Sequence, residues 1–94
     1  MEKTKISSYI GFSIRSGKVL FGIDSVEKYN KRIQLVLVSN TISENSLQNV
    51  KTVCEKKNVE YMLLDFSIED ITKRNNCKVL GILNPELSKA IKNS

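Results

Sequence analysis

The sequence predicts an α/β protein: a single domain over residues 1–94, folded as a three-layer α/β/α sandwich around a small four-stranded, mostly parallel or mixed sheet. Three observations lead to this prediction. Segments with helical periodicity alternate with short apolar strands, which is typical of a sheet covered by helices on both faces. Turn residues separate these segments, with no linker or repeat between them. The length of 94 residues allows one small hydrophobic core.

The first elements are set by isoleucines and glycines. Isoleucines recur four residues apart, as on one face of a helix: Ile6, Ile10 and Ile14. We expect this helix to end at Gly17, since glycine readily takes the left-handed conformation that follows a helix. A short apolar strand over residues 18–21 lies between Gly17 and Gly22, and a helix over residues 23–30 follows.

The middle of the chain predicts a buried strand, a helix and a second strand. Residues 33–38 are rich in Ile, Val and Leu, as expected of a strand buried on both faces. Ser43 is a suitable N-cap for a helix that runs to about Lys57. The next strand is predicted over residues 61–64.

The last elements are marked by capping residues. Ser67 followed by Asp70 resembles a capping box and predicts a short helix over residues 68–73. An apolar strand is expected over residues 79–83. Asn84, followed directly by proline, predicts the start of a terminal helix, because Asn caps well and proline is tolerated in the first turn.

Composition argues against catalysis and against metal binding. The chain has no histidine, which removes the commonest general base. Its two cysteines, Cys54 and Cys77, lack the paired spacing of a zinc site, and we expect free thiols in a reducing compartment. We therefore expect no enzyme activity, no metal and no cofactor.

The charge distribution favours an anionic partner. The net charge is +5, and residues 1–32 alone carry +4, with seven lysines and arginines against three acids. No apolar run reaches the roughly 18 residues that a membrane span requires. The first residues also lack the apolar core of a signal peptide, so we expect a cytoplasmic protein with no membrane partner.

The glycine-bounded segment 16–28 contains the first candidate site. A helix that begins directly after Gly22 presents polar side chains and free backbone N–H groups, a geometry suited to phosphates and base edges. The same residues also fit an ordinary strand–turn–helix connection. In open α/β sheets functional loops gather at one edge, and we expect the segments after Gly17, after Gly22 and around 73–76 to meet there.

The order of these elements resembles the kink-turn-binding ribosomal proteins, relatives of archaeal L-seven-Ae and eukaryotic L-thirty-e, and most closely their bacterial YlxQ branch. The resemblance covers about residues 8–91. The order and spacing of several short segments carry it: Gly11-Phe12, Arg15-Ser16-Gly17-Lys18, Gly22–Lys28, Leu35–Val38, Ser43–Ser46 and Cys54–Val59.

This resemblance implies an RNA-binding sandwich that recognises a sharply bent kink-turn. The family signature has a glycine, a variable residue, Asn-Glu and, six positions after the glycine, a lysine. Gly22 and Lys28 match its ends, whereas Asp24 and Ser25 replace the Asn-Glu pair. An ionised carboxylate only accepts hydrogen bonds, so Asp24 can meet guanine N–H groups but cannot donate to guanine O6.

The resemblance also implies a second RNA contact in the loop after the fourth helix. Ile71-Thr72 stands where the family has Leu-Gly, and the loop is basic and rich in amides. Arg74 could stack on an unstacked base or fork onto a phosphate. A solvated turn, in which Asn accommodates a left-handed backbone, fits this loop equally well.

The leading hypothesis is a non-catalytic protein that binds a kink-turn-like or ribosomal RNA. The candidate RNA-binding residues are Gly17, Lys18, Gly22, Asp24, Ser25, Lys28, Lys73, Arg74, Asn75 and Asn76. We expect a monomer whose partners are RNA and, through it, the ribosome, and we expect no DNA. The alternative is a protein–protein interaction module on the same fold, which Asp24 and Glu27 favour and the basic charge opposes.

Overall fold

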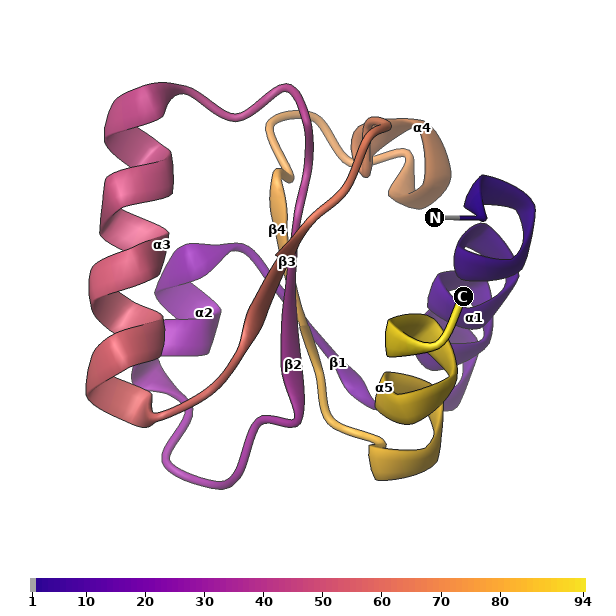
Figure 1. The fold of residues 1–94 in the computed structure, drawn as a ribbon, viewed down its shortest axis with the longest axis horizontal. Helices are drawn as coiled ribbons and strands as arrows, with labels where there is room; N and C mark the ends of the chain where they lie inside the picture. The colour runs from indigo at the N-terminus through magenta and orange to yellow at the C-terminus, as the bar shows by residue number, and fades with distance from the viewer. Residues whose placement is uncertain (1) are drawn as a thin grey trace.

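The computed structural model describes residues 2–94 and confirms the three-layer sandwich (Figure 1). The elements follow the expected order: α1 (Lys3–Ser16), β1 (Val19–Phe21), α2 (Ile23–Lys28), β2 (Leu35–Val38), α3 (Glu44–Lys57), β3 (Tyr61–Leu63), α4 (Glu69–Thr72), β4 (Val79–Ile82) and α5 (Pro85–Lys92). Helices α2 and α3 cover one face of the sheet, and α1, α4 and α5 cover the other (Figure 1).

The sheet is mixed, and the last strand lies inside it. The strand order is β1-β4-β2-β3, with β2 parallel to β3 and β4 antiparallel to both of its neighbours. Strands β2 and β4 are buried along their whole length. The buried central strand predicted for residues 33–38 is confirmed, but it begins two residues later, at Leu35. Because β4 lies between β1 and β2, the ends of segments distant in sequence become neighbours.

Each face of the sheet has its own half of the core. Alternate residues of β2 point to opposite faces, as strand geometry requires: Leu37 packs with α1 and α5, and Val38 packs with α2 and α3. Gly81 in β4 lets α2 approach closely, since a Cβ at this position would lie 3.2 Å from a methyl group of Val26.

Three of the predicted helix ends are confirmed. Gly17 ends α1 in the left-handed conformation, with φ 73°. The backbone N–H of Ser46 donates to Ser43 Oγ at 3.2 Å, which caps α3. Asn84 Oδ1 accepts the N–H of Glu86 at 2.8 Å and caps α5.

The predicted cap of α4 is wrong. Residue Ile68, not Ser67, occupies the N-cap position, and α4 is a single turn that begins at Glu69. The reason is a tertiary hydrogen bond: the buried N–H of Ile68 donates to Ser39 Oγ at 3.1 Å. A side chain from a distant loop therefore replaces the local cap. Helix α2 also ends at Lys28, two residues before the expected end.

Two further expectations concern the thiols and the membrane. Cys54 and Cys77 are both free, as expected. Both are buried, and burial raises the pKa of each thiol. Within residues 2–94, no helix has the length and apolar character needed to cross a membrane.

Candidate nucleic-acid interface

Gly22 connects β1 to α2 in a conformation that other residues rarely adopt. Its φ is 86° and its ψ is 160°, and its N–H donates to the carbonyl of Val79 at 2.8 Å. This hydrogen bond ties the start of α2 to the start of β4. Asp24 and Ser25 follow in the first turn of α2, where both are exposed to solvent.

The loop 73–76 is exposed and partly left-handed. Lys73 ends α4 with φ 60°, and Asn76 has φ 62°. The prediction that an Asn of this loop accommodates a left-handed backbone is confirmed at Asn76. All four loop residues, Asn75 included, are exposed to solvent.

Arg74 brings this loop to the Gly22 segment. Its guanidinium carbon lies 3.8 Å from the centre of the Phe21 ring, the residue directly before Gly22. The Phe21 ring itself packs against the core on the α1 and α5 side. The segments after Gly22 and around 73–76 therefore meet at one edge of the sheet, as expected.

A network of polar side chains holds the loop in place. Glu69 Oε2 accepts the N–H of Asn76 at 3.1 Å, while Glu69 Oε1 accepts from Thr41 Oγ1 at 2.9 Å and from Lys78 Nζ at 3.3 Å. The Thr41 hydrogen bond is the largest of the effects that lower the pKa of Glu69 below its ordinary value, and the Lys78 ammonium acts in the same direction. The network joins the β2–α3 loop, α4 and the start of β4.

A pocket of about 290 Å³ opens beside Gly22. Its apolar lining comes from Ile23, Ile42, Val50 and Val79, and its polar lining from Ser46, Asn49, Asn76 and Lys78. We call this pocket, together with Gly22, Asp24, Ser25 and the loop 73–76, the Gly22 edge. The sequence analysis did not identify Ile42, Ser46 or Asn49 as site residues, because only the packing of α3 and the loop before it against α2 and β4 brings them here.

Two candidate residues lie away from the Gly22 edge, and a third lies one helical turn from it. Gly17 and Lys18 precede β1, and the four residues between Gly17 and Gly22 place the two glycines up to about 16 Å apart. Gly17 and Lys18 line a different pocket, of about 520 Å³, together with Tyr29 and Asn84. Lys28 is the last residue of α2 and directly precedes Tyr29, one helical turn after Asp24 on the same face of the helix. The expected meeting of the Gly17 segment with the loop 73–76 does not occur, because β1 runs across the sheet between them.

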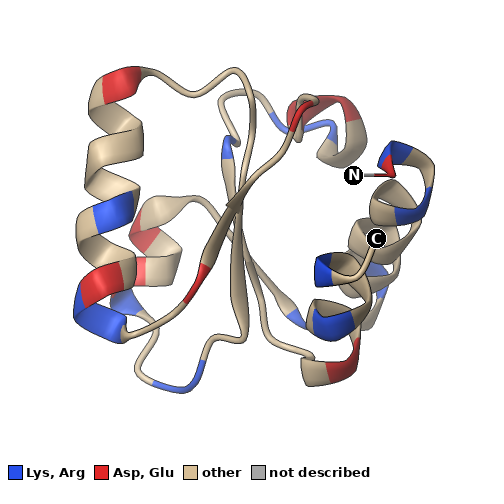
Figure 2. Cartoon of the chain, in the orientation of Figure 1, with Lys and Arg blue, Asp and Glu red and all other residues tan. Residues whose placement is uncertain are grey.

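The Gly22 edge is not strongly basic. Helices α2, α3 and α4 all begin there and carry acids in their first turns: Asp24, Glu44, Glu69 and Asp70. Its cations are Lys73, Arg74 and Lys78, and Lys78 pairs with Glu69 at 3.3 Å. Figure 2 shows this mixture of red and blue around the start of α3, α4 and the following loop.

The described part of the chain, residues 2–94, contains no group of three or more His, Cys, Asp or Glu side chains placed to hold a metal ion.

Comparison with known proteins shows the fold alone. No family model and no curated protein matches the chain. Among solved structures, the chain is similar to a protein of unknown function from Bacillus halodurans, with a TM-score of 0.83 and 17% sequence identity over 95% of this chain and 94% of the other.

Proposed function

We propose that this protein is a non-catalytic RNA-binding protein and that its Gly22 edge holds a kinked RNA. The observation that carries the proposal is the position of Arg74, which stacks on Phe21 at 3.8 Å at the same edge as the pocket of about 290 Å³. Unpaired RNA bases are recognised by stacking on guanidinium or aromatic planes and by hydrogen bonds to their edges. Both means are present at this edge.

Arg74 is suited to contact a splayed base. Its guanidinium packs on the Phe21 ring, yet the residue remains exposed. A cation stacked on an aromatic ring is oriented in advance, so less side-chain entropy is lost on binding. Arg74 then contributes a flat, charged surface to an RNA base or a phosphate.

The pocket is suited to a single flipped-out base. Aliphatic side chains of Ile23 and Ile42 provide an apolar wall, and the amides of Asn49 and Asn76 lie among its polar groups. A pocket of this size is at the lower end of small-molecule sites, which fits one flat ring. The amides can both donate to and accept from base edges.

Asp24 limits the expected affinity. Its carboxylate accepts from guanine N–H groups but repels nearby phosphates. With other acids also at the Gly22 edge, we expect recognition by shape and base contacts more than by charge. The RNA we propose is a kinked stem in ribosomal or another structured RNA of the cytoplasm, bound by a monomer, and not DNA.

The test compares two RNA hairpins, one with a kink-turn internal loop and one with an uninterrupted stem. We expect wild-type protein to prefer the kinked hairpin. Arg74→Ala should weaken that binding by about 1–2 kcal/mol, a factor of roughly 5–30, by removing the stacked cation. Asn49→Trp, on the exposed face of α3, should block the pocket and reduce the preference without unfolding the protein.

Lys5→Ala is the control, since it removes one exposed cation from α1. Binding is measured by fluorescence anisotropy over a series of salt concentrations, and folding by circular dichroism. Equal affinity of wild-type protein for both hairpins, or unchanged binding by Arg74→Ala, would contradict the proposal that the Gly22 edge binds a kinked RNA.

One observation favours a protein partner instead. The acids in the first turns of α2, α3 and α4 make the Gly22 edge less positive than the chain as a whole. An interaction module would then bind a basic protein segment there. The ultraviolet absorbance ratio of the purified protein separates the two cases, because an RNA-binding protein retains nucleic acid.

A further inference from the structure

A basic surface, distinct from the Gly22 edge, lies at the other end of the strands. Its members come from the start of β1, the end of α2, the following loop and the end of α3: Lys18, Lys28, Lys31, Arg32 and Lys57. We call this surface the Lys31 edge. Figure 2 shows it as blue segments on the loop between α2 and β2 and at the end of α3.

Two adjacent pockets and one hydrogen bond join four of these cations into a single surface, and Lys28 directly precedes Tyr29, which lines both pockets. Tyr29 and Arg32 line both a pocket of about 190 Å³, shared with Lys31 and Lys57, and the pocket of about 520 Å³, shared with Lys18. Lys57 Nζ donates to the carbonyl of Tyr29 at 2.8 Å and fastens the loop to α3. The loop that carries Lys31 and Arg32 is therefore held in place.

Helix polarity explains only part of this charge. Lys28 and Lys57 lie in the last turns of α2 and α3, where a cation is favourable beside the helix C-terminus. Lys18, Lys31 and Arg32 lie outside the helices and are exposed. The two ion pairs recorded in residues 2–94 are Lys78–Glu69 and Lys92–Glu60, and neither includes a residue of the Lys31 edge.

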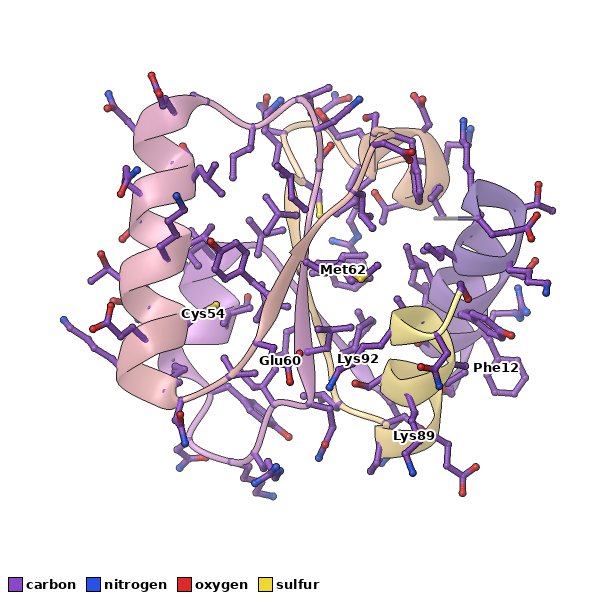
Figure 3. All side chains as sticks on the ribbon, viewed as in Figure 1. Phe12, Cys54, Glu60, Met62, Lys89 and Lys92 are labelled. Carbon is purple, nitrogen blue, oxygen red and sulfur yellow. The ribbon has the colours of Figure 1, made fainter. Side chains whose placement is uncertain are left out.

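The character of the surface indicates a phosphate backbone. Protein interfaces are built around buried aromatic or aliphatic anchors. The exposed large apolar side chains of the described residues are Phe12, Tyr61 and Leu63, and none lines these two pockets. Phe12 points outward from α1 (Figure 3). Exposed cations around one half-buried aromatic residue, Tyr29, suit a partner whose surface is uniformly charged.

We infer that the Lys31 edge is a second RNA-contacting surface, which binds the phosphate backbone of an RNA segment regardless of its bend. The inference rests on the proposed function in taking RNA as the partner. It extends that function, because the two edges lie at opposite ends of the strands and contact separate RNA segments. The Gly22 edge selects the RNA shape, and the Lys31 edge adds affinity that depends on salt.

The test uses a matched pair of double variants. Lys31→Gln/Arg32→Gln removes two charges from the Lys31 edge. Lys5→Gln/Lys89→Gln removes two exposed charges from α1 and α5. We expect the first variant to weaken binding of the kinked and the uninterrupted hairpin alike, by about tenfold at low salt. The slope of log K against log salt should fall by about 1.4–1.8, since each lost phosphate contact removes about 0.7–0.9. The second variant should change either quantity much less.

The outcomes distinguish failure of the Lys31 edge from failure of the Gly22 edge. Equal losses in both double variants would show that net charge alone matters, and would overturn the inference. A loss confined to the kinked hairpin, or no loss for Lys31→Gln/Arg32→Gln while Arg74→Ala is impaired, would overturn it and leave the Gly22 edge in place. Wild-type protein could bind both hairpins equally while Lys31→Gln/Arg32→Gln still weakens binding to both. That result would support the Lys31 edge as an RNA-contacting surface and contradict shape recognition at the Gly22 edge.

Discussion

The Gly22 edge and the Lys31 edge are built from opposite ends of the same two helices. Helices α2 and α3 begin at the Gly22 edge, with Asp24 and Glu44 in their first turns, and end at the Lys31 edge with Lys28 and Lys57. Each arrangement complements the partial charge of the helix terminus. As a result, the pocket and the stacked Arg74 lie where acids gather, and much of the basic charge lies at the far end.

This difference separates selectivity for RNA shape from salt-dependent affinity. The net charge of the sequence does not distinguish these two properties. A net charge of +5 predicts attraction to polyanions, but it does not say which surface attracts them. The Gly22 edge offers a pocket and a stacked guanidinium, whereas the Lys31 edge offers exposed cations. We therefore expect changes at one edge to alter selectivity and changes at the other to alter salt-dependent affinity.

The largest expected effect comes from Gly22, and Gly17 at the other end of β1 is the comparison. Gly22 has φ 86° and ψ 160°, a region open almost only to glycine, so Gly22→Ala should lower the free energy of unfolding by about 1–3 kcal/mol. Gly17, with φ 73° and ψ 13°, lies in the ordinary left-handed region, and Gly17→Ala should cost about 1 kcal/mol.

Urea denaturation of both glycine variants measures this difference. Apart from the adjacent residues, no atom lies within 4 Å of a Cβ built at either glycine, so the variants test backbone strain. Equal stability of the two variants would contradict the stronger constraint at Gly22. Gly22→Ala should also reduce the preference for the kinked hairpin, and Gly17→Ala should leave that preference intact.

Lys28→Ala should weaken RNA binding by about 1 kcal/mol, the value of one charge-assisted contact. Since Lys28 lies at the Lys31 edge, the loss should be the same for kinked and uninterrupted hairpins. Anisotropy titrations on the two RNAs measure it. A loss restricted to the kinked hairpin would instead place Lys28 in the shape-selective contact.

Lys73→Gly should raise the free energy of unfolding by about 0.5–1 kcal/mol. Lys73 ends α4 at φ 60°, a conformation that glycine adopts without strain. Asn58 ends α3 at φ 55° on the opposite edge, and Asn58→Gly should gain less, because Asn tolerates this region better than Lys. Thermal denaturation compares the two variants. A larger increase in stability for Asn58→Gly than for Lys73→Gly would contradict the greater backbone strain expected at Lys73.

The smallest expected effect depends on pH. The pKa of Glu69 is lowered in the folded protein, so its ionised form adds stability above the pKa of the unfolded chain. That contribution is lost as the pH falls through the lowered folded-state pKa. Glu69→Gln should therefore be less stable than wild type at pH 7, and the difference should shrink on acidification below about pH 4.5.

Denaturation of wild type and Glu69→Gln at pH 7 and pH 3 tests this effect. Glu60→Gln is the control, because Glu60 is 71% exposed and pairs with Lys92 at the surface. A difference between wild type and Glu69→Gln that does not change with pH would mean that the carboxylate charge does not hold the loop 73–76.

The order of elements and most helix ends could be predicted because the signals are local. The isoleucine spacing of α1, the stop at Gly17 and the caps Ser43 and Asn84 each depend on residues within a few positions of one another. The start of α4 could not be predicted in this way. There, Ser39 takes the N–H of Ile68, and this bond depends on where the β2–α3 loop lies in space.

The sequence by itself determined the layered α/β architecture and identified the segment 16–28 and the loop 73–76 as candidate site segments. Only the tertiary structure decided which segments meet. By entering the sheet between β1 and β2, β4 places Val79 against Gly22 and the preceding loop against Phe21. The length of β1 separates Gly17 and Lys18 from that edge. Strand order and antiparallel pairing arise from contacts between distant residues, and local periodicity does not encode them.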